Sequence, residues 1–282
     1  MTRSRFRPTL VLTAFLFAGT AHLVIALQVA SATQAPAVVA ASNVPAATAK
    51  IWLDDRVSLE ESLRTAKIAK IDDIGIGVTK PKRAYFAAGG PVASASWKPL
   101  RPGRYNGYWE SYKSEIAAYE LDKVLGMDMV PPTVERTVSG EPGAATIWVA
   151  PVRMFKVGEN TASIPNRANW DRQVRKMKLF DNLIHNPDRN AGNLLIDPSG
   201  NLILIDHSRA FESQRGLVTK LERYDRDLWT RIDEITPEAL TAAVQKYLTG
   251  GEIKAMLDRR EAMRAELKKL LASKAAAQVL VP

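Results

Sequence analysis

The sequence predicts a two-lobed α+β domain, in which a small β-rich lobe with one key helix precedes a larger, mainly helical lobe. Short strand-like segments separated by Gly and Pro dominate the first half of the chain, whereas apolar residues recur at helical spacing through most of the second half. A loop and a predicted hairpin in the second half carry an Asp, an Asn and a second Asp. With 282 residues, of which 46% are hydrophobic, the chain is long enough to bury a full core.

The N-terminus has the pattern of an export signal. Three arginines among the first seven residues precede an uncharged apolar run over residues 9–32. The run ends in a small-x-small motif, as in a cleaved signal peptide, but it is also as long as the ~20 residues that span a bilayer, so a membrane anchor stays open. Residues 33–50 form an Ala/Pro-rich linker. Because no further Lys or Arg occurs before Lys50, we expect residues 51–282 outside the cytoplasm, exported or anchored.

Composition limits the partners that we expect. The formal net charge of +9 favours an acidic partner such as a nucleotide, a phospholipid head group or an anionic glycan. The sequence has no nucleic-acid-reading motif and no basic run with interleaved aromatic residues, so we expect no nucleic acid. The chain lacks cysteine, which excludes disulfides, thiolate catalysis and Cys-ligated metals.

The first lobe is predicted over residues 51–158. Ser58-Leu-Glu-Glu61 has the form of a capping box, and the apolar spacing through Leu63, Ile68 and Ile71 predicts a short helix. The next two apolar stretches predict a hairpin that turns at Gly89 and Gly90 and ends in Lys98.

The rest of this lobe and the second lobe, residues 159–282, follow from periodicity. A helix is predicted over residues 112–125, closed by Gly126, and two more strands before residue 156. Residues 169–184 predict an amphipathic helix, and a loop and a β-hairpin follow it. Charged amphipathic helix then runs over residues 236–273, with a break at Gly250-Gly251.

The stretch from Phe180 to Phe211 carries the chemistry. Asp188 precedes Asn193 by five positions, and Asp206 ends the second strand of the hairpin that follows. Phosphoryl transfer needs a carboxylate that orients the acceptor hydroxyl, together with an amide oxygen and a second carboxylate that hold Mg²⁺ against phosphates. The spacing therefore predicts a site for phosphoryl transfer.

These residues resemble the core of the protein-kinase-like superfamily, especially type II phosphatidylinositol 4-kinases, HipA-like kinases and Fam20/four-jointed secretory kinases. DRNAGN and IDHSRAF match the catalytic and metal loops of those families. The resemblance implies a bilobal kinase-like fold that binds ATP with Mg²⁺ or Mn²⁺. It implies that Asp188 is the catalytic base or hydroxyl-orienting residue and that Asn193 and Asp206 are metal ligands. The departure is Ser208, where most relatives have Gly.

The same resemblance extends to the first lobe through ASASWKPL and YKSEIAAYELDKV. It implies that Lys98 holds the nucleotide phosphates and that Glu115 pairs with Lys98. Glu115 is preferred over Glu110 and Glu120 because the adjoining helical face is apolar. The turn at Gly89-Gly90 is either a reduced phosphate-covering loop or, as we favour, a plain tight turn.

Three further polar side chains have two interpretations each. Arg189 either reaches a phosphate of the cofactor or, as we favour, braces the catalytic loop through a carboxylate such as Asp181. His185 and His207 lack a third partner at metal-ligand spacing, so we expect packed or hydrogen-bonded residues.

The predicted function is transfer of a phosphoryl group from ATP to a hydroxyl of a lipid head group, a glycan or a protein. The basic charge favours an anionic acceptor, and the membrane becomes a partner if the N-terminal segment is not cleaved. The main alternative is an inactive, exported or tethered pseudokinase that binds nucleotide or a partner. An antibiotic-type phosphotransferase shares the Asp-x4-Asn loop, but the helix and strand of the first lobe disfavour it.

Overall fold

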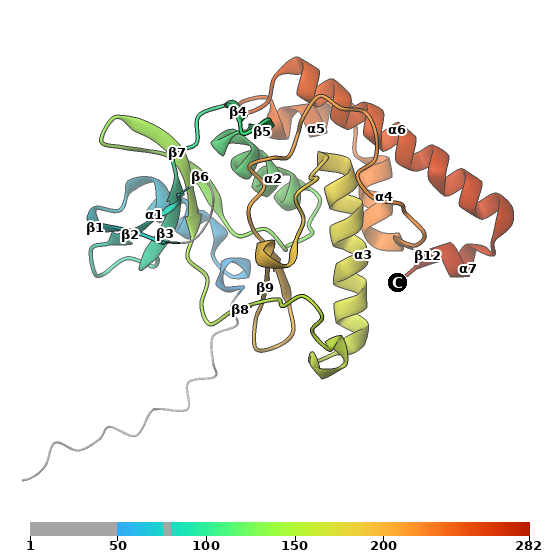
Figure 1. Cartoon of the computed structure of the whole chain (residues 1–282), viewed down its shortest axis with the longest axis horizontal. Coiled ribbons are helices and arrows are strands. Elements are labelled where there is room, and N and C mark those ends of the chain that lie inside the picture. The colour runs from blue at the N-terminus through green and yellow to red at the C-terminus, as the bar shows by residue number, and fades with distance from the viewer. Residues whose placement is uncertain (1–49, 76–79) are drawn as a thin grey trace, which may run out of the picture. The chain divides into compact units, whose positions relative to one another are not determined.

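The computed structural model describes residues 50–75 and 80–282 (Figure 1). The predicted signal or anchor segment and nearly all of the predicted linker lie outside these residues. Within the described ranges, no helix combines the length and the apolar character needed to cross a membrane.

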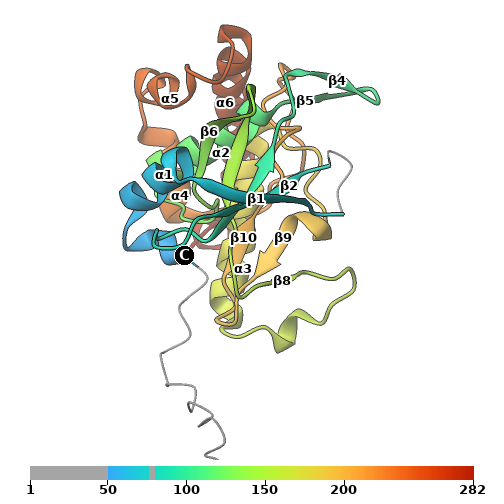
Figure 2. The ribbon, with the colours of Figure 1, turned by 90° about the vertical axis from the view of Figure 1, so that its left-hand side faces the viewer.

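The smaller lobe is built on a five-stranded antiparallel sheet with the order β1-β2-β3-β7-β6 (Figures 1 and 2). Its strands are β1 (Ile68–Asp73), β2 (Lys82–Phe86), β3 (Ser94–Lys98), β6 (Thr133–Val138) and β7 (Glu141–Ile147). A short hairpin of β4 (Gly103–Tyr105) and β5 (Tyr108–Glu110) follows β3. The predicted strands of this lobe are therefore present.

Two helices contact β6 and β7 of this sheet, and both begin at a side-chain cap. Helix α2 (Tyr112–Val124) is N-capped by Ser111 and ends before Gly126, whose φ of +55° suits glycine. This helix matches the prediction. Helix α1 (Arg56–Thr65) follows a short 3₁₀ turn, Ile51–Leu53.

The predicted extent and cap of α1 were wrong. Asp55, not Ser58, is the N-cap, because its carboxylate accepts a hydrogen bond from the Ser58 backbone N–H at 3.1 Å. Ile68 and Ile71 belong to β1, where Ile71 is opposite Ala84 of β2. Apolar residues three positions apart fit a helical pattern, but pairing with β2 decides the conformation.

The larger lobe is mainly helical. Its helices are α3 (Arg167–Ile184), α4 (Arg226–Glu234), α5 (Pro237–Val244), α6 (Gly250–Ser273) and α7 (Ala276–Val279), with 3₁₀ turns at Thr161–Ser163 and Ala191–Asn193. The predicted break between α5 and α6 is present: Thr249 and Glu252 form a capping box that starts a new helix at Gly250.

The predicted hairpin after α3 consists of β9 (Leu194–Ile196) and β10 (Leu202–Leu204). Strand β8 (Arg153–Met154) adds to it on the β9 side. A second small pair joins β11 (Tyr224–Asp225) to β12 (Leu280–Val281) in parallel.

Two main hydrophobic clusters underlie the two lobes. One joins the sheet to α1 through residues such as Leu63 and Trp97. The other joins the C-terminal helices and includes Ala117, Tyr119 and Leu121 of α2. Because α2 also contacts β6 and β7, it packs on both the sheet and the helical lobe. This arrangement confirms the predicted α+β architecture.

Candidate active site

Three charged side chains from distant segments meet between the lobes. Lys98 is the last residue of β3, Glu115 lies in the first turn of α2, and Asp206 follows β10. The Lys98 Nζ is 2.5 Å from Glu115 Oε1 and 2.8 Å from Asp206 Oδ1. The predicted Lys98–Glu115 pair is confirmed, and it lies on the side of β3 that faces Asp206.

Within this cluster, Lys98 and Glu115 are charged and nearly closed to solvent. Only 10% of the Lys98 side chain and 7% of the Glu115 side chain are exposed. Burial alone would neutralise both groups, but the two carboxylates raise the pKa of Lys98. Burial alone would raise the pKa of Glu115, but Lys98 and His207 lower it below the ordinary value. The cluster is therefore an ionised network built before any ligand binds.

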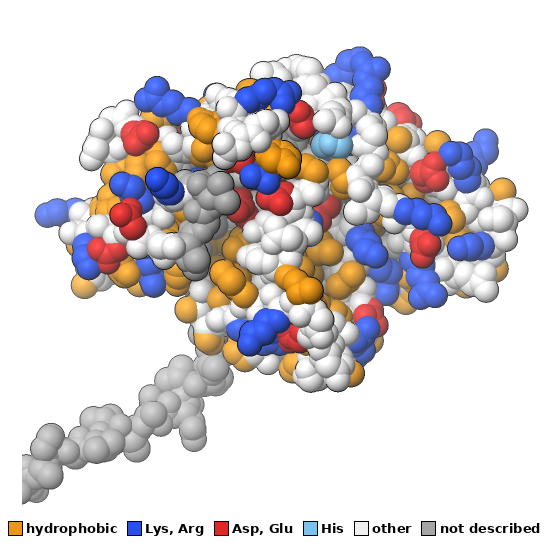
Figure 3. Space-filling view, in the orientation of Figure 1, with side chains coloured by type: hydrophobic (Ala, Val, Ile, Leu, Met, Phe, Trp, Pro, Cys, Tyr) orange, Lys and Arg blue, Asp and Glu red, His pale blue; other side chains and the backbone are white. Residues whose placement is uncertain are grey.

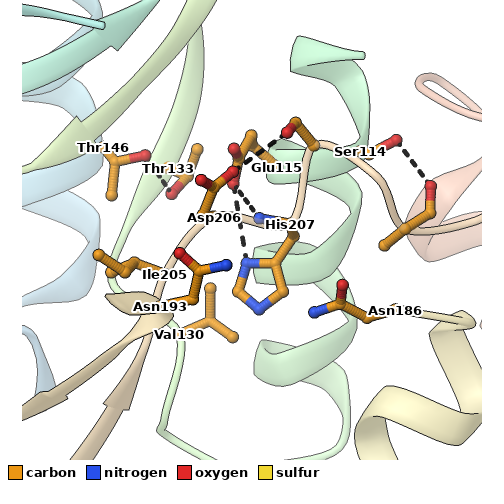
Figure 4. A network of polar contacts seen from close by, with 12 residues as sticks. Ser114, Glu115, Val130, Thr133, Thr146, Asn186, Asn193, Ile205, Asp206 and His207 are labelled. Atoms are coloured by element: carbon orange, nitrogen blue, oxygen red, sulfur yellow. Dashed lines mark hydrogen bonds and ion pairs between the residues drawn. The ribbon is translucent and has the colours of Figure 1, made fainter. Parts of the chain in front are cut away.

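His207 supports Glu115 from the loop after β10. Its backbone N–H donates to Glu115 Oε2 at 2.8 Å, and its ring Nδ1 lies 3.7 Å from the same oxygen (Figure 4). The ring packs edge-on against Phe180. His185 ends α3, with its Nδ1 3.1 Å from the carbonyl oxygen of Gly216. The His207 ring is thus packed, and its buried Nε2 has no hydrogen-bond partner among the described residues, whereas the His185 ring is hydrogen-bonded. Both agree with the prediction of packed or hydrogen-bonded residues.

Ser208 replaces the glycine of similar loops without backbone strain. The positive φ values of this loop fall at Asp206 (58°) and Phe211 (67°), not at Ser208. The Ser208 hydroxyl donates to Asp206 Oδ1 at 3.1 Å. The side chain at position 208 therefore contacts the proposed metal ligand directly.

Arg189 braces the loop that carries Asp188. Its Nε and Nη2 donate to the Asp181 carboxylate, and its Nη1 donates to the carbonyl oxygens of Asn193 and Ile205. Only 7% of the side chain is exposed. The favoured bracing interpretation is confirmed. The alternative of a phosphate-binding Arg189 does not fit, because protein acceptors already engage all three guanidinium nitrogens.

Asp188 lies at the more open side of the site, with 35% of its side chain exposed. The Asn193 Nδ2 donates to the Asp188 backbone carbonyl at 2.8 Å, which ties the two ends of the loop together. Asn190 donates to both the backbone and side-chain oxygens of Asp188. The loop therefore presents the Asp188 carboxylate to solvent in a defined orientation.

Asn193 and Asp206 suit a hard divalent cation. The two residues lie on adjacent strand ends, where the Ile205 N–H donates to the Asn193 carbonyl at 3.2 Å (Figure 4). Because the Asn193 Nδ2 donates its hydrogen bond to the Asp188 carbonyl, the side-chain oxygen of Asn193 remains available as a metal ligand near the Asp206 carboxylate (Figure 4). Across the described ranges, no three His, Asp or Glu side chains form a metal-holding group. An amide oxygen and one carboxylate fit Mg²⁺, which keeps waters and binds phosphate oxygens.

Gly89 and Gly90 are not near these groups. They form the turn between β2 and β3. At the turn end of this hairpin, Ser94 is opposite Tyr85. At the opposite end, Trp97 is opposite Lys82. Lys98 lies beyond Trp97, so the glycine turn lies at the far end of the hairpin. The interpretation of a phosphate-covering loop was therefore wrong, and the favoured tight turn holds.

A second pair of glycines occurs at the other end of these strands. Lys82 is opposite Asp73 of β1, so the β1–β2 connection leaves the sheet beside Lys98. Gly75, with a φ of +73°, opens this connection, and Gly77 follows in the sequence. Residues 76–79 lie outside the described ranges. The register of the strands, and not the presence of two adjacent glycines, identifies which turn lies beside Lys98.

No protein-family model matches the chain, and no curated protein matches it. Solved structures do. The Golgi casein kinase with Mn and ADP bound has a TM-score of 0.63 and 18% identity over 79% of this chain and 78% of that one. Hydra Fam20 with sugar has a TM-score of 0.61 and 17% identity over 79% and 91%. The Helicobacter pylori proinflammatory kinase CtkA has a TM-score of 0.53 and 13% identity over 75% of this chain and 98% of that one. The chain therefore has a protein-kinase-like fold, as the sequence predicted.

Proposed function

We propose that this protein is an ATP-dependent phosphotransferase that moves a phosphoryl group to an acceptor hydroxyl. One observation carries the proposal: a buried Lys98 bridges Glu115 and Asp206, while Asp188 and Asn193 lie on the adjoining loop. A kinase-like fold alone does not require these five residues. Together they are the groups that position phosphates, a metal and a hydroxyl.

Each side chain has a role in this proposal. Lys98 binds the nucleotide phosphates, and Glu115 holds Lys98 in place. Asn193 and Asp206 would hold Mg²⁺ or Mn²⁺, which neutralises phosphate charge when bound. The solved Golgi casein kinase, with its Mn and ADP, supports this choice of cofactor.

Asp188 acts on the acceptor. It orients the hydroxyl and accepts its proton as the oxygen bonds to the γ-phosphorus, and the bond to the β-phosphate oxygen breaks to release ADP. The acceptor hydroxyl belongs to a lipid head group, a glycan or a protein. Lys and Arg are spread among Asp and Glu over the face in Figure 3, so the +9 charge does not by itself favour one of these classes.

A nucleotide-binding pseudokinase is the second candidate, and Ser208 favours it. The Ser208 hydroxyl and the Lys98 ammonium both donate hydrogen bonds to Asp206 Oδ1, so a metal would compete with two existing contacts. Retention of Asp188, Asn193 and the Lys98–Glu115 pair argues for turnover instead.

Incubation with ATP and Mg²⁺ or Mn²⁺ separates the two candidates. The acceptors are phosphoinositide vesicles, a glycosaminoglycan oligosaccharide set and a casein digest, and mass spectrometry detects a gain of one phosphoryl group. We expect one class to be labelled, and Asp188→Asn to abolish labelling. Metal-dependent ATP binding without any labelled product or released phosphate would support the pseudokinase.

We further propose that residues 1–32 export or anchor a kinase-like domain over residues 51–282 through the linker 33–50. The arginine-flanked apolar run supports this proposal. A C-terminal alkaline phosphatase fusion should be active. A silent phosphatase with a fluorescent cytoplasmic reporter at the same position would contradict the exported topology.

A further inference from the structure

Arg209 has contacts that the roles above do not use. Its Nε donates to Glu110 Oε1 at 2.8 Å, and its Nη1 lies 3.2 Å from Asp188 Oδ2. Its guanidinium carbon lies 4.3 Å from the centre of the Tyr108 ring. Arg209 therefore joins β5 to the residue that faces the acceptor.

The surrounding backbone holds Arg209 in this position. The loop that carries it runs alongside the start of α2, where the Ser111 N–H donates to the Ser208 carbonyl at 2.9 Å. The Ser114 hydroxyl donates to the Ala210 carbonyl at 3.1 Å. These bonds on either side of Arg209 fix its backbone, and Glu110 and Tyr108 fix its guanidinium.

Charge balance decides between two roles for Arg209. A site for an anionic acceptor needs a cation that lacks a counter-charge, but Arg209 already lies between the carboxylates of Glu110 and Asp188. Glu110 is buried, with 3% of its side chain exposed, so it requires the cation. The triad contains one positive and two negative charges, so it favours orientation of Asp188 over recruitment of an anion.

The two oxygens of Asp188 are also distinguished. Oδ2 faces Arg209, whereas Oδ1 accepts a hydrogen bond from Asn190 at 3.3 Å, near the limit of such bonds. Arg209 thus holds one oxygen and leaves the more weakly bonded oxygen for a hydroxyl.

We propose that Arg209 is a positioning residue, held by Glu110 and Tyr108, that orients the Asp188 carboxylate toward the acceptor hydroxyl. This inference rests on the proposed phosphotransferase function. It predicts that Arg209 affects turnover only through Asp188.

A double-mutant cycle tests this dependence. Phosphate release from Mn-ATP, with water as the acceptor, is measured for Arg209→Met, Asp188→Asn and the double variant, and ATP affinity is measured by calorimetry. Arg209→Met should lower kcat about 10-fold or more and leave the nucleotide Kd within about twofold. In the Asp188→Asn background, the same substitution should change kcat little. Arg209→Lys, which keeps the charge, should recover part of the rate.

Arg104→Met is the matched control. Arg104 also ties the β4–β5 hairpin to the neighbouring segment, through Glu212 at 3.3 Å, but it does not contact Asp188. We expect its kcat to equal that of the wild type. If Arg209→Met does not fold, as judged by its melting transition, Arg209→Lys is carried through the same cycle.

The outcomes separate this inference from the proposed function. Equal losses from Arg209 substitution in both Asp188 backgrounds, an unchanged kcat, or a nucleotide Kd that rises as much as kcat falls would overturn the positioning role alone. A wild-type protein that neither binds nor consumes Mn-ATP would overturn the proposed function, and this inference with it.

Discussion

The inner and outer sides of the site differ in how completely their charges are fixed. On the inner side, Lys98 and Glu115 are buried and directly bonded. On the outer side, about a third of Asp188 is exposed, and its carboxylate has an ion pair and one long hydrogen bond. Asp206 belongs to both, because it bonds Lys98 but keeps 35% of its side chain exposed.

In the proposed phosphotransferase, this difference separates nucleotide binding from the chemical step. A buried Lys98 that Glu115 already holds in place suits nucleotide phosphates, because the ammonium group is positioned before the ligand arrives. An accessible carboxylate suits an acceptor that must enter and leave. Substitutions on the inner side should therefore change nucleotide affinity, whereas substitutions on the outer side should change turnover.

The largest effect is expected for Asp206→Asn. The substitution removes the proposed charged metal ligand, and such a ligand contributes several kcal/mol, so Mg-ATP affinity should fall by more than about 100-fold. Isothermal titration calorimetry measures this loss, and a circular dichroism spectrum like that of the wild type is the control. Unchanged affinity would remove Asp206 from the site.

Asp188→Asn should give the opposite pattern. Turnover should fall by about 100-fold or more, because a positioned base or orienting group is lost, while the nucleotide Kd stays nearly the same. Steady-state rates and calorimetry on one preparation provide both numbers. Equal losses of binding and turnover would indicate a structural role for Asp188 and would erase the difference between the two sides.

Lys98→Met tests whether the inner network serves both binding and stability. It should weaken ATP binding about 10-fold and lower the free energy of unfolding by about 3 kcal/mol, because Glu115 becomes an uncompensated buried charge. Adding Glu115→Gln should restore stability but not ATP affinity. Urea denaturation and calorimetry measure the two quantities, and ATP affinity that returns with Glu115→Gln would contradict a direct role for Lys98.

Glu115 also predicts an acid sensitivity. Burial opposes its charge, but Lys98 and His207 hold its pKa below the ordinary 4.5. The stabilisation is therefore present above about pH 4.5 and lost as the pH falls below that value. Denaturation between pH 3 and pH 7 should show a smaller loss for Glu115→Gln than for the wild type. Parallel curves would contradict the ion pair.

Asp122 is a control carboxylate on the same helix and outside the site. It accepts hydrogen bonds from the backbone N–H groups of Met129 and Val130, and its other oxygen is buried without a partner. Burial raises its pKa from 3.8 to about 7. Because Asp122 ionises at a lower pH in the unfolded chain than in the folded protein, the free energy of unfolding should fall as the pH rises from about 4 to 7.

Asp122→Asn should remove this loss while leaving ATP affinity unchanged. The variant should gain about 3 kcal/mol relative to the wild type between pH 4 and pH 8. Denaturation at both pH values measures the gain. If the stability difference between the variant and the wild type does not change with pH, Asp122 is not neutral in the folded protein. If the variant also changes ATP affinity, substitution of any buried carboxylate on α2 affects binding, and the effects of Glu115 substitutions are not specific to the site.

The sequence predicted the inner side better than the outer side. The resemblance to kinase-like motifs predicted Lys98 and Glu115, and the spacing of the catalytic loop and hairpin predicted Asp206. These residues lie at the end of β3, in the first turn of α2 and after β10. The Arg209–Glu110 contact joins residues 99 positions apart, one in the loop after β10 and the other at the end of β5. Such a contact depends on tertiary packing that sequence periodicity does not encode.

The errors in the fold have the same origin. The three-residue spacing of Ile68 and Ile71 fits a helix, but pairing with β2 places both residues in a strand whose register shifts between Ile68 and Lys70. Gly89 and Gly90 have the composition of a phosphate loop, but the register of β2 and β3 places them at the wrong end. In both cases a tertiary contact decided what the local pattern left open.

The most direct test of the phosphotransferase proposal is the metal dependence of ATP binding. Calorimetric titration of ATP into the wild-type protein is compared in Mn²⁺ and in excess EDTA. If Asn193 and Asp206 hold the metal against the phosphates that Lys98 contacts, saturable 1:1 binding should occur with Mn²⁺ and be lost in EDTA. Equal binding in both solutions, or binding in neither, would contradict the proposed site.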